Sequence, residues 1–209
     1  AESLHEETGT YRELLQPGLR RALVIGIVLA TFVQFTGISP LDFYLPVIFQ
    51  KAGFEKASDA IFQMAIVNGW MWVCTIVAIW LVDRIGRRPL LLGGITGMAI
   101  GMALLGIMFF RGITGEIVVF VTMFCLGCFI ASIAPVFWLL TSELFPTRLR
   151  GKGMSVSSLS HWAASFISTQ AIPSMLAFAE DRFHSIATVF WVFGICLLYT
   201  SPSPRDRQK

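Results

Sequence analysis

The chain has 209 residues, of which 55% are hydrophobic and 14% are charged, whereas an ordinary soluble domain carries about 25% charged residues. Its mean hydropathy is +0.70. These values exclude an ordinary soluble domain and predict an integral membrane protein embedded in a lipid bilayer. The net charge of +3 is small, and no basic stripe interleaves with exposed aromatic residues, so nucleic acid is not an expected partner.

Six apolar runs follow one another along the chain, separated by short connections. A helix needs roughly 20 residues to cross a bilayer, and its backbone groups are then satisfied internally. The fold class predicted is therefore an all-α membrane protein, a bundle of six transmembrane helices. In chain order the expected spans are about 19–49, 57–82, 89–110, 116–141, 152–179 and 183 to about 195.

Two of these runs contain residues that break helices. Gly37 and Pro40 interrupt the first run, and Pro135 interrupts the fourth, because proline removes a backbone donor and clashes with the preceding turn. Freed backbone groups at membrane depth are tolerated where they line a cavity, as in transporters. The pattern therefore predicts a cavity beside both breaks.

Both ends of the chain differ from its centre. Residues 1–18 are polar and begin with alanine rather than methionine, which we interpret as the end of a cytoplasmic linker in a fragment of a longer protein. Residues 196–209 end the sixth run early with serine, proline and alternating charge. We expect this tail to be non-native; an ordinary disordered cytoplasmic tail is the alternative.

Basic residues are distributed unequally between the two sides of the predicted bundle. Nine lie on one side and four on the other, and the positive-inside rule places the richer side in the cytoplasm. Both termini are then cytoplasmic, in what we expect to be the plasma membrane. The nine are Arg12, Arg20, Arg21, Arg84, Arg87, Arg88, Arg148, Arg150 and Lys152; the four are Lys51, Lys56, Arg111 and Arg182.

Cysteine and glycine spacing indicates helix packing rather than chemistry. Cys125 and Cys128 have the spacing of a metal or redox pair, but no second pair accompanies them. We interpret them as small packing residues, and no metal or other cofactor is expected. Gly93, Gly97 and Gly101 recur every four residues in the third run, which predicts a face where another helix approaches closely.

Polar side chains within the spans are the candidate functional residues, because they are expensive in lipid. Gln34 lies in the first run, Asn68 in the second, and His161 within a seam of serines at 158, 165 and 168 in the fifth, next to Trp162. Trp138 follows Pro135, and its ring could stack on a sugar. Each has a structural alternative: hydrogen bonding between helices, packing of the histidine, or serine bonding to its own helix.

Three stretches carry a resemblance to a known family. "VDRIGRRPLLL" (82–92), "PVFWLLTSELFPTRLRGKGMS" (135–155) and "QFTGIS" followed by "FYLPVIFQKAGF" (34–54) resemble the sugar porter family of the major facilitator superfamily. The resemblance implies the C-terminal six-helix half of a twelve-helix carrier, formed by residues 19–195. "YRELLQPGLRR" (11–21) resembles the end of the linker between the two halves.

The resemblance also implies roles for residues at two sites, an inner gate and a substrate site. It implies an ion-pair network that closes an inner gate; a basic loop set only by topology is the alternative. The gate residues would be Asp83, Arg87, Arg88, Glu143 and Arg150. The substrate-binding residues would be Gln34, Asn68, Trp138 and Trp162, with Ser39 and His161 at positions where the family usually has asparagine.

The function expected is therefore that of a fragment of a secondary transporter working by alternating access. The substrate would be a sugar, polyol, sugar acid or similar small hydrophilic solute, and the other partner would be a missing N-terminal six-helix half. A membrane nutrient sensor on the same fold is the alternative. An enzyme is not expected, because catalysis in the membrane would need paired acids, a metal cluster or a Ser–His–Asp set, and we expect no acid at mid-membrane depth.

Overall fold

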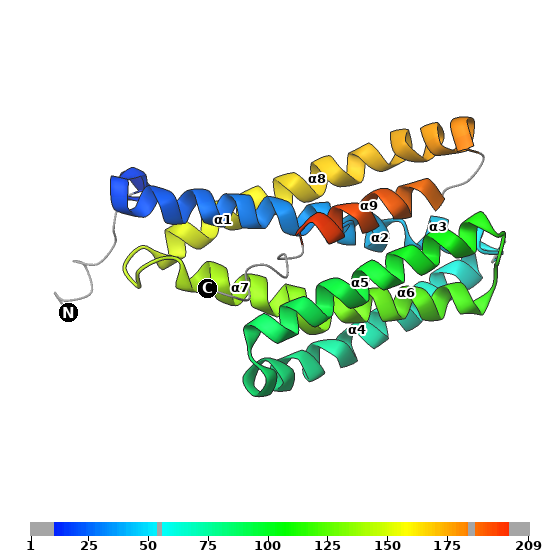
Figure 1. Cartoon of the computed structure of the whole chain (residues 1–209), viewed down its shortest axis with the longest axis horizontal. Coiled ribbons are helices and arrows are strands. Elements are labelled where there is room, and N and C mark those ends of the chain that lie inside the picture. Colours follow the sequence, from blue (N-terminus) through cyan, green and yellow to red (C-terminus); the bar gives the residue numbers. More distant parts are fainter. Residues whose placement is uncertain (1–10, 54–55, 184–186, 201–209) are drawn as a thin grey trace.

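The computed structural model describes residues 11–53, 56–183 and 187–200. Its helices run roughly along one long axis, so that segments far apart in sequence lie side by side (Figure 1). In chain order the elements are η2 (Tyr11–Leu15), α1 (Pro17–Phe35), α2 (Ile38–Phe43), α3 (Leu45–Lys51), α4 (Ala57–Ile85), α5 (Arg87–Phe110), α6 (Glu116–Cys128), the π-helical turn η3 (Phe129–Ile133), α7 (Ala134–Glu143), α8 (Arg150–Phe183) and α9 (Ala187–Thr200).

The all-helical membrane fold predicted from the sequence is confirmed. Within the described residues, four helical stretches are long and apolar enough to cross a membrane: Pro17–Phe43, Ser58–Ile85, Arg87–Phe110 and Glu116–Glu143. The fifth and sixth predicted spans correspond to α8 and α9. Helix α8 has 34 residues but is less apolar than the other spans, because it carries the serine seam, and α9 has only 14 residues.

The first span bends at Gly37. This residue has φ +84° and ψ +11°, the left-handed conformation that glycine adopts without the steric penalty of a side chain. A Cβ at this position would also lie 2.6 Å from the Phe193 ring of α9. Helix α1 therefore ends at Phe35, and the chain restarts as the short helix α2.

The fourth span changes its winding before Pro135. Residues Phe129–Ile133 form a π-helical turn between α6 and α7, and Pro135 stands in the first turn of α7. The Ala134 amide, just before the proline, bonds the Phe129 carbonyl five residues earlier, which is the wider spacing of a π-helix. The irregular winding thus lies immediately N-terminal to the proline.

Glycines and cysteines pack α5 against α6 and η3. A Cβ at Gly97 would lie 2.6 Å from the Cys128 sulfur, and one at Gly101 would lie 2.8 Å from Cys125 Cβ. The expectation for Gly93 was wrong, because nothing lies within 4 Å of a Cβ there. Gly94 takes its place: a Cβ would meet the Ser132 hydroxyl at 1.5 Å. The cysteines thus serve as packing residues in this structure.

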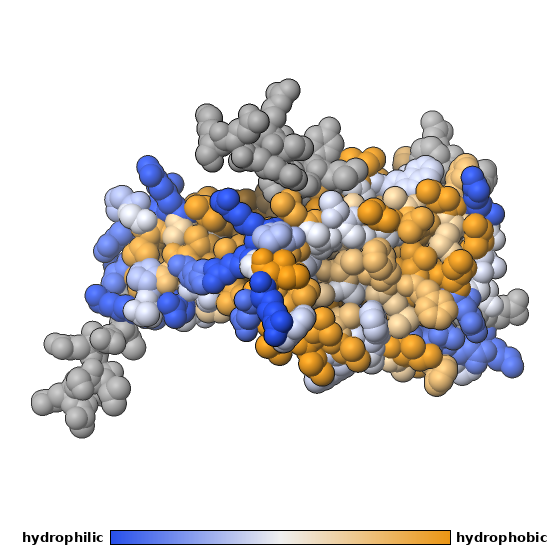
Figure 2. Space-filling view, turned by 60° about the horizontal axis from the view of Figure 1, so that its bottom comes forward, coloured by the Kyte–Doolittle hydropathy of each residue, from blue (hydrophilic) through white to orange (hydrophobic). Residues whose placement is uncertain are grey.

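Hydrophobic side chains cover much of the outer surface as well as the core. Figure 2 shows hydrophobic residues over much of one face, most densely to the right of its centre, with hydrophilic residues at both ends of the long axis and a further group near the centre. Trp72, Ile76 and Phe120 are more than half exposed. This distribution fits a chain whose flanks contact lipid.

The expectation for the C-terminal tail falls partly outside the described residues. Helix α9 continues through residues 196–200, so the first part of that tail is helical. Residues 201–209 lie outside the described part of the chain, as do residues 1–10 of the expected linker.

Candidate functional site

A hydrogen-bonded network joins α1, α2 and α8 at the break in the first span. The Gln34 amide Nε2 lies 2.7 Å from His161 Nε2, and the Ser39 hydroxyl donates to Gln34 Oε1 over 2.5 Å. Ser165 in turn donates to the Ser39 hydroxyl over 2.9 Å. As placed, the Gln34 amide nitrogen is the donor to His161 Nε2, and His161 Nδ1 has no hydrogen-bond partner among the described residues. We call these four side chains the Gln34 network.

The break at Gly37 makes this network feasible. A straight helix would carry residue 39 out of reach of residue 34, because residues five apart do not share a helix face. The left-handed Gly37 turns α2 so that Ser39 returns to the Gln34 amide. Gln34 itself is only 2% exposed, so its polar atoms depend on these protein partners.

Aromatic rings surround the imidazole. Phe137 stacks on His161 with ring centroids 5.1 Å apart and an interplanar angle of 18°. The rings of Trp138 and Trp162 each lie 5.6 Å from it, centroid to centroid. Trp138 remains 38% exposed and Trp162 62% exposed, so both can offer part of a ring face to a bound molecule.

Asn68 is separate from this cluster in its hydrogen bonding. Its amide donates to the Met64 carbonyl of its own helix over 3.0 Å. Five of the six predicted substrate residues are therefore linked by hydrogen bonds or ring contacts, and the sixth is not. The linked five are Gln34, Ser39, Trp138, His161 and Trp162.

Two apolar hollows lie apart from the Gln34 network. One, of about 30 Å³, is lined by residues of α2, α3, α5, α8 and α9, including Gly37 and Pro40. The other, an open groove of about 510 Å³, lies between α1 and α5 and is lined by Val28, Phe32 and Ile95 among others. Neither hollow has any of the four network residues in its lining.

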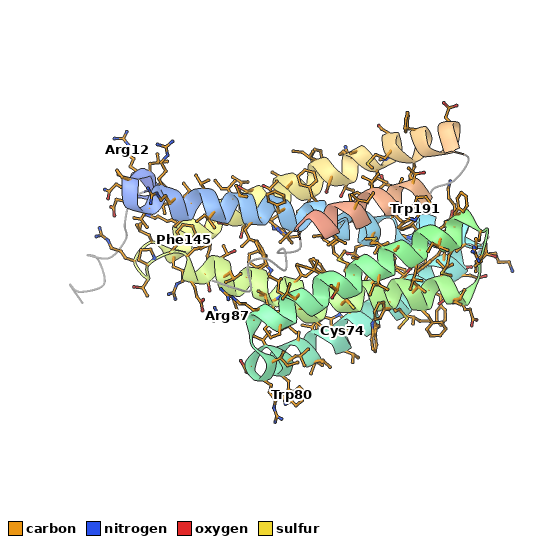
Figure 3. All side chains as sticks on the ribbon, in the orientation of Figure 1. Arg12, Cys74, Trp80, Arg87, Phe145 and Trp191 are labelled. Atoms are coloured by element: carbon orange, nitrogen blue, oxygen red, sulfur yellow. The ribbon has the colours of Figure 1, made fainter. Side chains whose placement is uncertain are left out.

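At the opposite end of α7 from Pro135, an ion pair joins the last residue of α7 to the first residue of α5. Both terminal nitrogens of Arg87 bond to the two carboxylate oxygens of Glu143, one of them over 2.5 Å. Figure 3 shows Arg87 where α5 begins, near the end of α7. Arg150 adds positive potential around Glu143. Asp83 and Arg88, the other predicted gate residues, are exposed and form no ion pair in the described part of the chain.

Contacts at the same end hold the segment before α1, and sequence reasoning missed them. Glu13 pairs with Arg148 over 3.5 Å, and the Lys152 ammonium lies 5.2 Å from the Tyr11 ring centroid. Phe145, labelled in Figure 3, is buried in a small apolar cluster with residues of η2 and α1. These contacts fasten η2 to the loop between α7 and α8 and to the first turn of α8.

The family model described as "Sugar (and other) transporter" matches residues 1–202. The chain belongs to this sugar transporter family. It is 34% identical over 199 residues to the arabinose-proton symporter of Bacillus subtilis, covering 93% of this chain and 42% of that protein. It is 35% identical over 199 residues to the major myo-inositol transporter IolT of the same organism, covering 91% and 40%.

Solved structures of the sugar transporter family share this fold. The crystal structure of a D-xylose-proton symporter matches with a TM-score of 0.79 and 32% identity, over 96% of this chain and 44% of that chain. The resemblance to sugar porters and the prediction of an integral membrane transporter fold are thus confirmed. This family member spans less than half the length of the relatives it matches.

Two features of this sugar transporter chain escaped the sequence analysis. Phe137 stacks on His161, although nothing in the local pattern distinguishes it from a packing residue. The second is Asp42, an acid in α2 at the C-terminal end of the helical stretch Pro17–Phe43. A count of charges inside the first run would have found it.

Proposed function

We propose that this chain is the C-terminal six-helix half of a secondary transporter that moves a sugar or related small hydrophilic solute by alternating access. The observation that carries the proposal is the Gln34 network, a set of polar side chains placed beside exposed tryptophan rings at a break in a membrane span. Amide, hydroxyl and imidazole groups offer hydrogen bonds to sugar hydroxyls, and aromatic faces fit the apolar face of a sugar ring.

Membership in the sugar transporter family supports the substrate class. The names of the relatives refer to arabinose, myo-inositol and D-xylose, which are neutral and rich in hydroxyl groups. We assign substrate contact to Gln34, Ser39, Trp138, His161 and Trp162. For Asn68, substrate contact stays a prediction, because its amide is bonded to its own helix.

The share of each relative that is matched supports the assignment to one half. The chain covers 42% of the arabinose-proton symporter and 40% of the myo-inositol transporter. A second half would complete the carrier and cover the face that carries Trp138 and Trp162. Basic residues are in excess on the side of the bundle that carries Arg20, Arg87 and Arg150, which supports cytoplasmic termini. We propose the plasma membrane as the location.

The test is uptake by the full-length carrier that contains this chain, expressed in cells lacking their own sugar carriers. We expect saturable uptake of at least one of labelled arabinose, D-xylose and myo-inositol. We expect none from the 209-residue chain alone in vesicles, because it supplies one wall of the pathway. Failure of the full-length carrier on all three solutes contradicts sugar transport, and saturable uptake by the isolated chain contradicts its assignment as one half.

We propose the Arg87–Glu143 pair as a latch of the inner gate, with Arg150 beside it. The two side chains are 41% and 49% exposed, and such pairs contribute about 0 to 1 kcal/mol. Glu143→Gln should therefore shift a balanced equilibrium up to about fivefold toward the inward-open state. The readout is the labelling rate of a cysteine introduced at Ser142, measured with a thiol reagent from the cytoplasmic side.

Asp83→Asn is the matched control for this experiment. It removes the same charge from the same end of the molecule, but Asp83 forms no ion pair in the described part of the chain. Its labelling rate should stay close to that of the unmodified carrier. An equal change in both variants would mean that the net charge of the loops, rather than the Arg87–Glu143 pair, controls opening.

A further inference from the structure

The first span carries one charged residue that the Gln34 network does not use. Between Arg21 and Lys51 the only charged side chain is that of Asp42. It is half-buried and forms neither an ion pair nor a hydrogen bond within the described part of the chain. A charged group inside a membrane span is expensive and calls for a functional explanation.

Asp42 lies on the same side of α2 as Ser39. Ile38, Pro40 and Leu41 are buried against the bundle, whereas Ser39 and Asp42 are partly exposed and Phe43 is 60% exposed. At 100° per residue, positions 39, 42 and 43 fall within one 100° arc. The carboxylate-bearing residue therefore shares the open face of α2 with a member of the Gln34 network.

Beyond the Ser39–Ser165 contact, α2 and α8 each carry a further polar side chain. Helices α2 and α8 run in the same direction, and Ser165 bonds to Ser39 between them. Asp42 is three residues beyond Ser39, a rise of about 4.5 Å, and Thr169 is four residues beyond Ser165. The Thr169 hydroxyl is buried and has no hydrogen-bond partner among the described residues. Asp42 and Thr169 thus lie at about the same level along the helix axes, about one turn beyond the Ser39–Ser165 contact in the direction of Lys51.

We propose that Asp42 is a charge filter for the transported solute, with Thr169 as its polar neighbour. A carboxylate accepts hydrogen bonds from the hydroxyl groups of a neutral sugar or polyol. It repels the carboxylate of a sugar acid, and this repulsion is stronger near a protein interior than in bulk water. The site therefore selects neutral polyhydroxylated solutes and rejects sugar acids. The inference rests on the proposed transport function and narrows its substrate class.

The experiment compares two competitors that differ at one carbon, D-glucose with a hydroxymethyl group at C6 and D-glucuronate with a carboxylate there. Each is used to inhibit uptake by the full-length carrier of whichever of arabinose, D-xylose and myo-inositol it transports. The measured quantity is the ratio of half-inhibitory concentrations, glucuronate over glucose. Asp42→Asn should lower this ratio at least about tenfold, which corresponds to about 1.4 kcal/mol. Asp42→Ser, which removes the charge with a different side chain, should act in the same direction.

Two controls separate charge at this position from other effects. Asp42→Glu keeps the carboxylate and should retain a high ratio. Asp59→Asn removes an exposed acid from the start of α4 and should leave the ratio unchanged. A ratio within about twofold of that of the unmodified carrier in both Asp42→Asn and Asp42→Ser, with neutral-sugar uptake preserved, overturns the charge filter alone. Absence of neutral-sugar uptake in the unmodified carrier instead overturns the proposed function.

Discussion

Alanine at Gln34 is expected to weaken sugar binding by the full-length carrier about tenfold or more. The side chain is 2% exposed and bonds both His161 and Ser39. Leaving a buried partner unsatisfied costs about 1 to 3 kcal/mol, and each 1.4 kcal/mol is a factor of ten. The variant also loses the amide that would bond a substrate hydroxyl. The measurement is the KM for uptake together with the amount of carrier in the membrane.

Thr31→Ala is the matched control for Gln34→Ala. Thr31 lies three residues earlier on the same helix, and its hydroxyl bonds the Ile27 carbonyl of that helix over 2.8 Å. Its loss should change KM less than about threefold, or about 0.6 kcal/mol, the low end of the range for a single hydrogen bond, since this bond joins no second helix. A KM for Gln34→Ala equal to that of Thr31→Ala would remove the Gln34 network from the substrate site.

Leucine at Gly94 is expected to destabilise the bundle by about 3 kcal/mol or more, the upper range for overpacked side chains. A Cβ at this position would lie 1.5 Å from the Ser132 hydroxyl and 3.1 Å from the Cys128 carbonyl oxygen. The π-helical turn would have to move away from α5. In the full-length carrier, such a loss lowers Tm by roughly 3 to 6 °C, because the unfolding entropy that divides the free-energy loss grows with chain length; the measurement is thermal unfolding of the purified carrier in detergent.

Gly93→Leu provides a control at the adjacent residue. It adds the same side chain to the same helix, but nothing lies within 4 Å of a Cβ there. Its Tm should stay within about 2 °C of that of the unmodified carrier, as for substitutions without close neighbours. Equal losses in the two variants would indicate that leucine disturbs α5 itself rather than its contact with η3.

The sequence by itself determined the class of protein, the helical segments and the places where they break. The third expected span, 89–110, differs by two residues from α5, because the length of an apolar run and the charges that flank it are local properties. The break at Gly37 was likewise readable, because glycine and proline act on the backbone of their own turn. The family motifs also lie in continuous stretches.

Only the tertiary structure decided which side chains meet. Gln34 and His161 are 127 positions apart, and whether they touch depends on how α1 and α8 are rotated about their axes. The rotation of α5 likewise makes Gly94 rather than Gly93 the contact with η3, and pairs Arg87 rather than Arg88 with Glu143. The rotation of α2 leaves Asp42 on its open face. A helix lacking a marked polar and apolar side carries little local information about its rotation, so packing against its neighbours decides it.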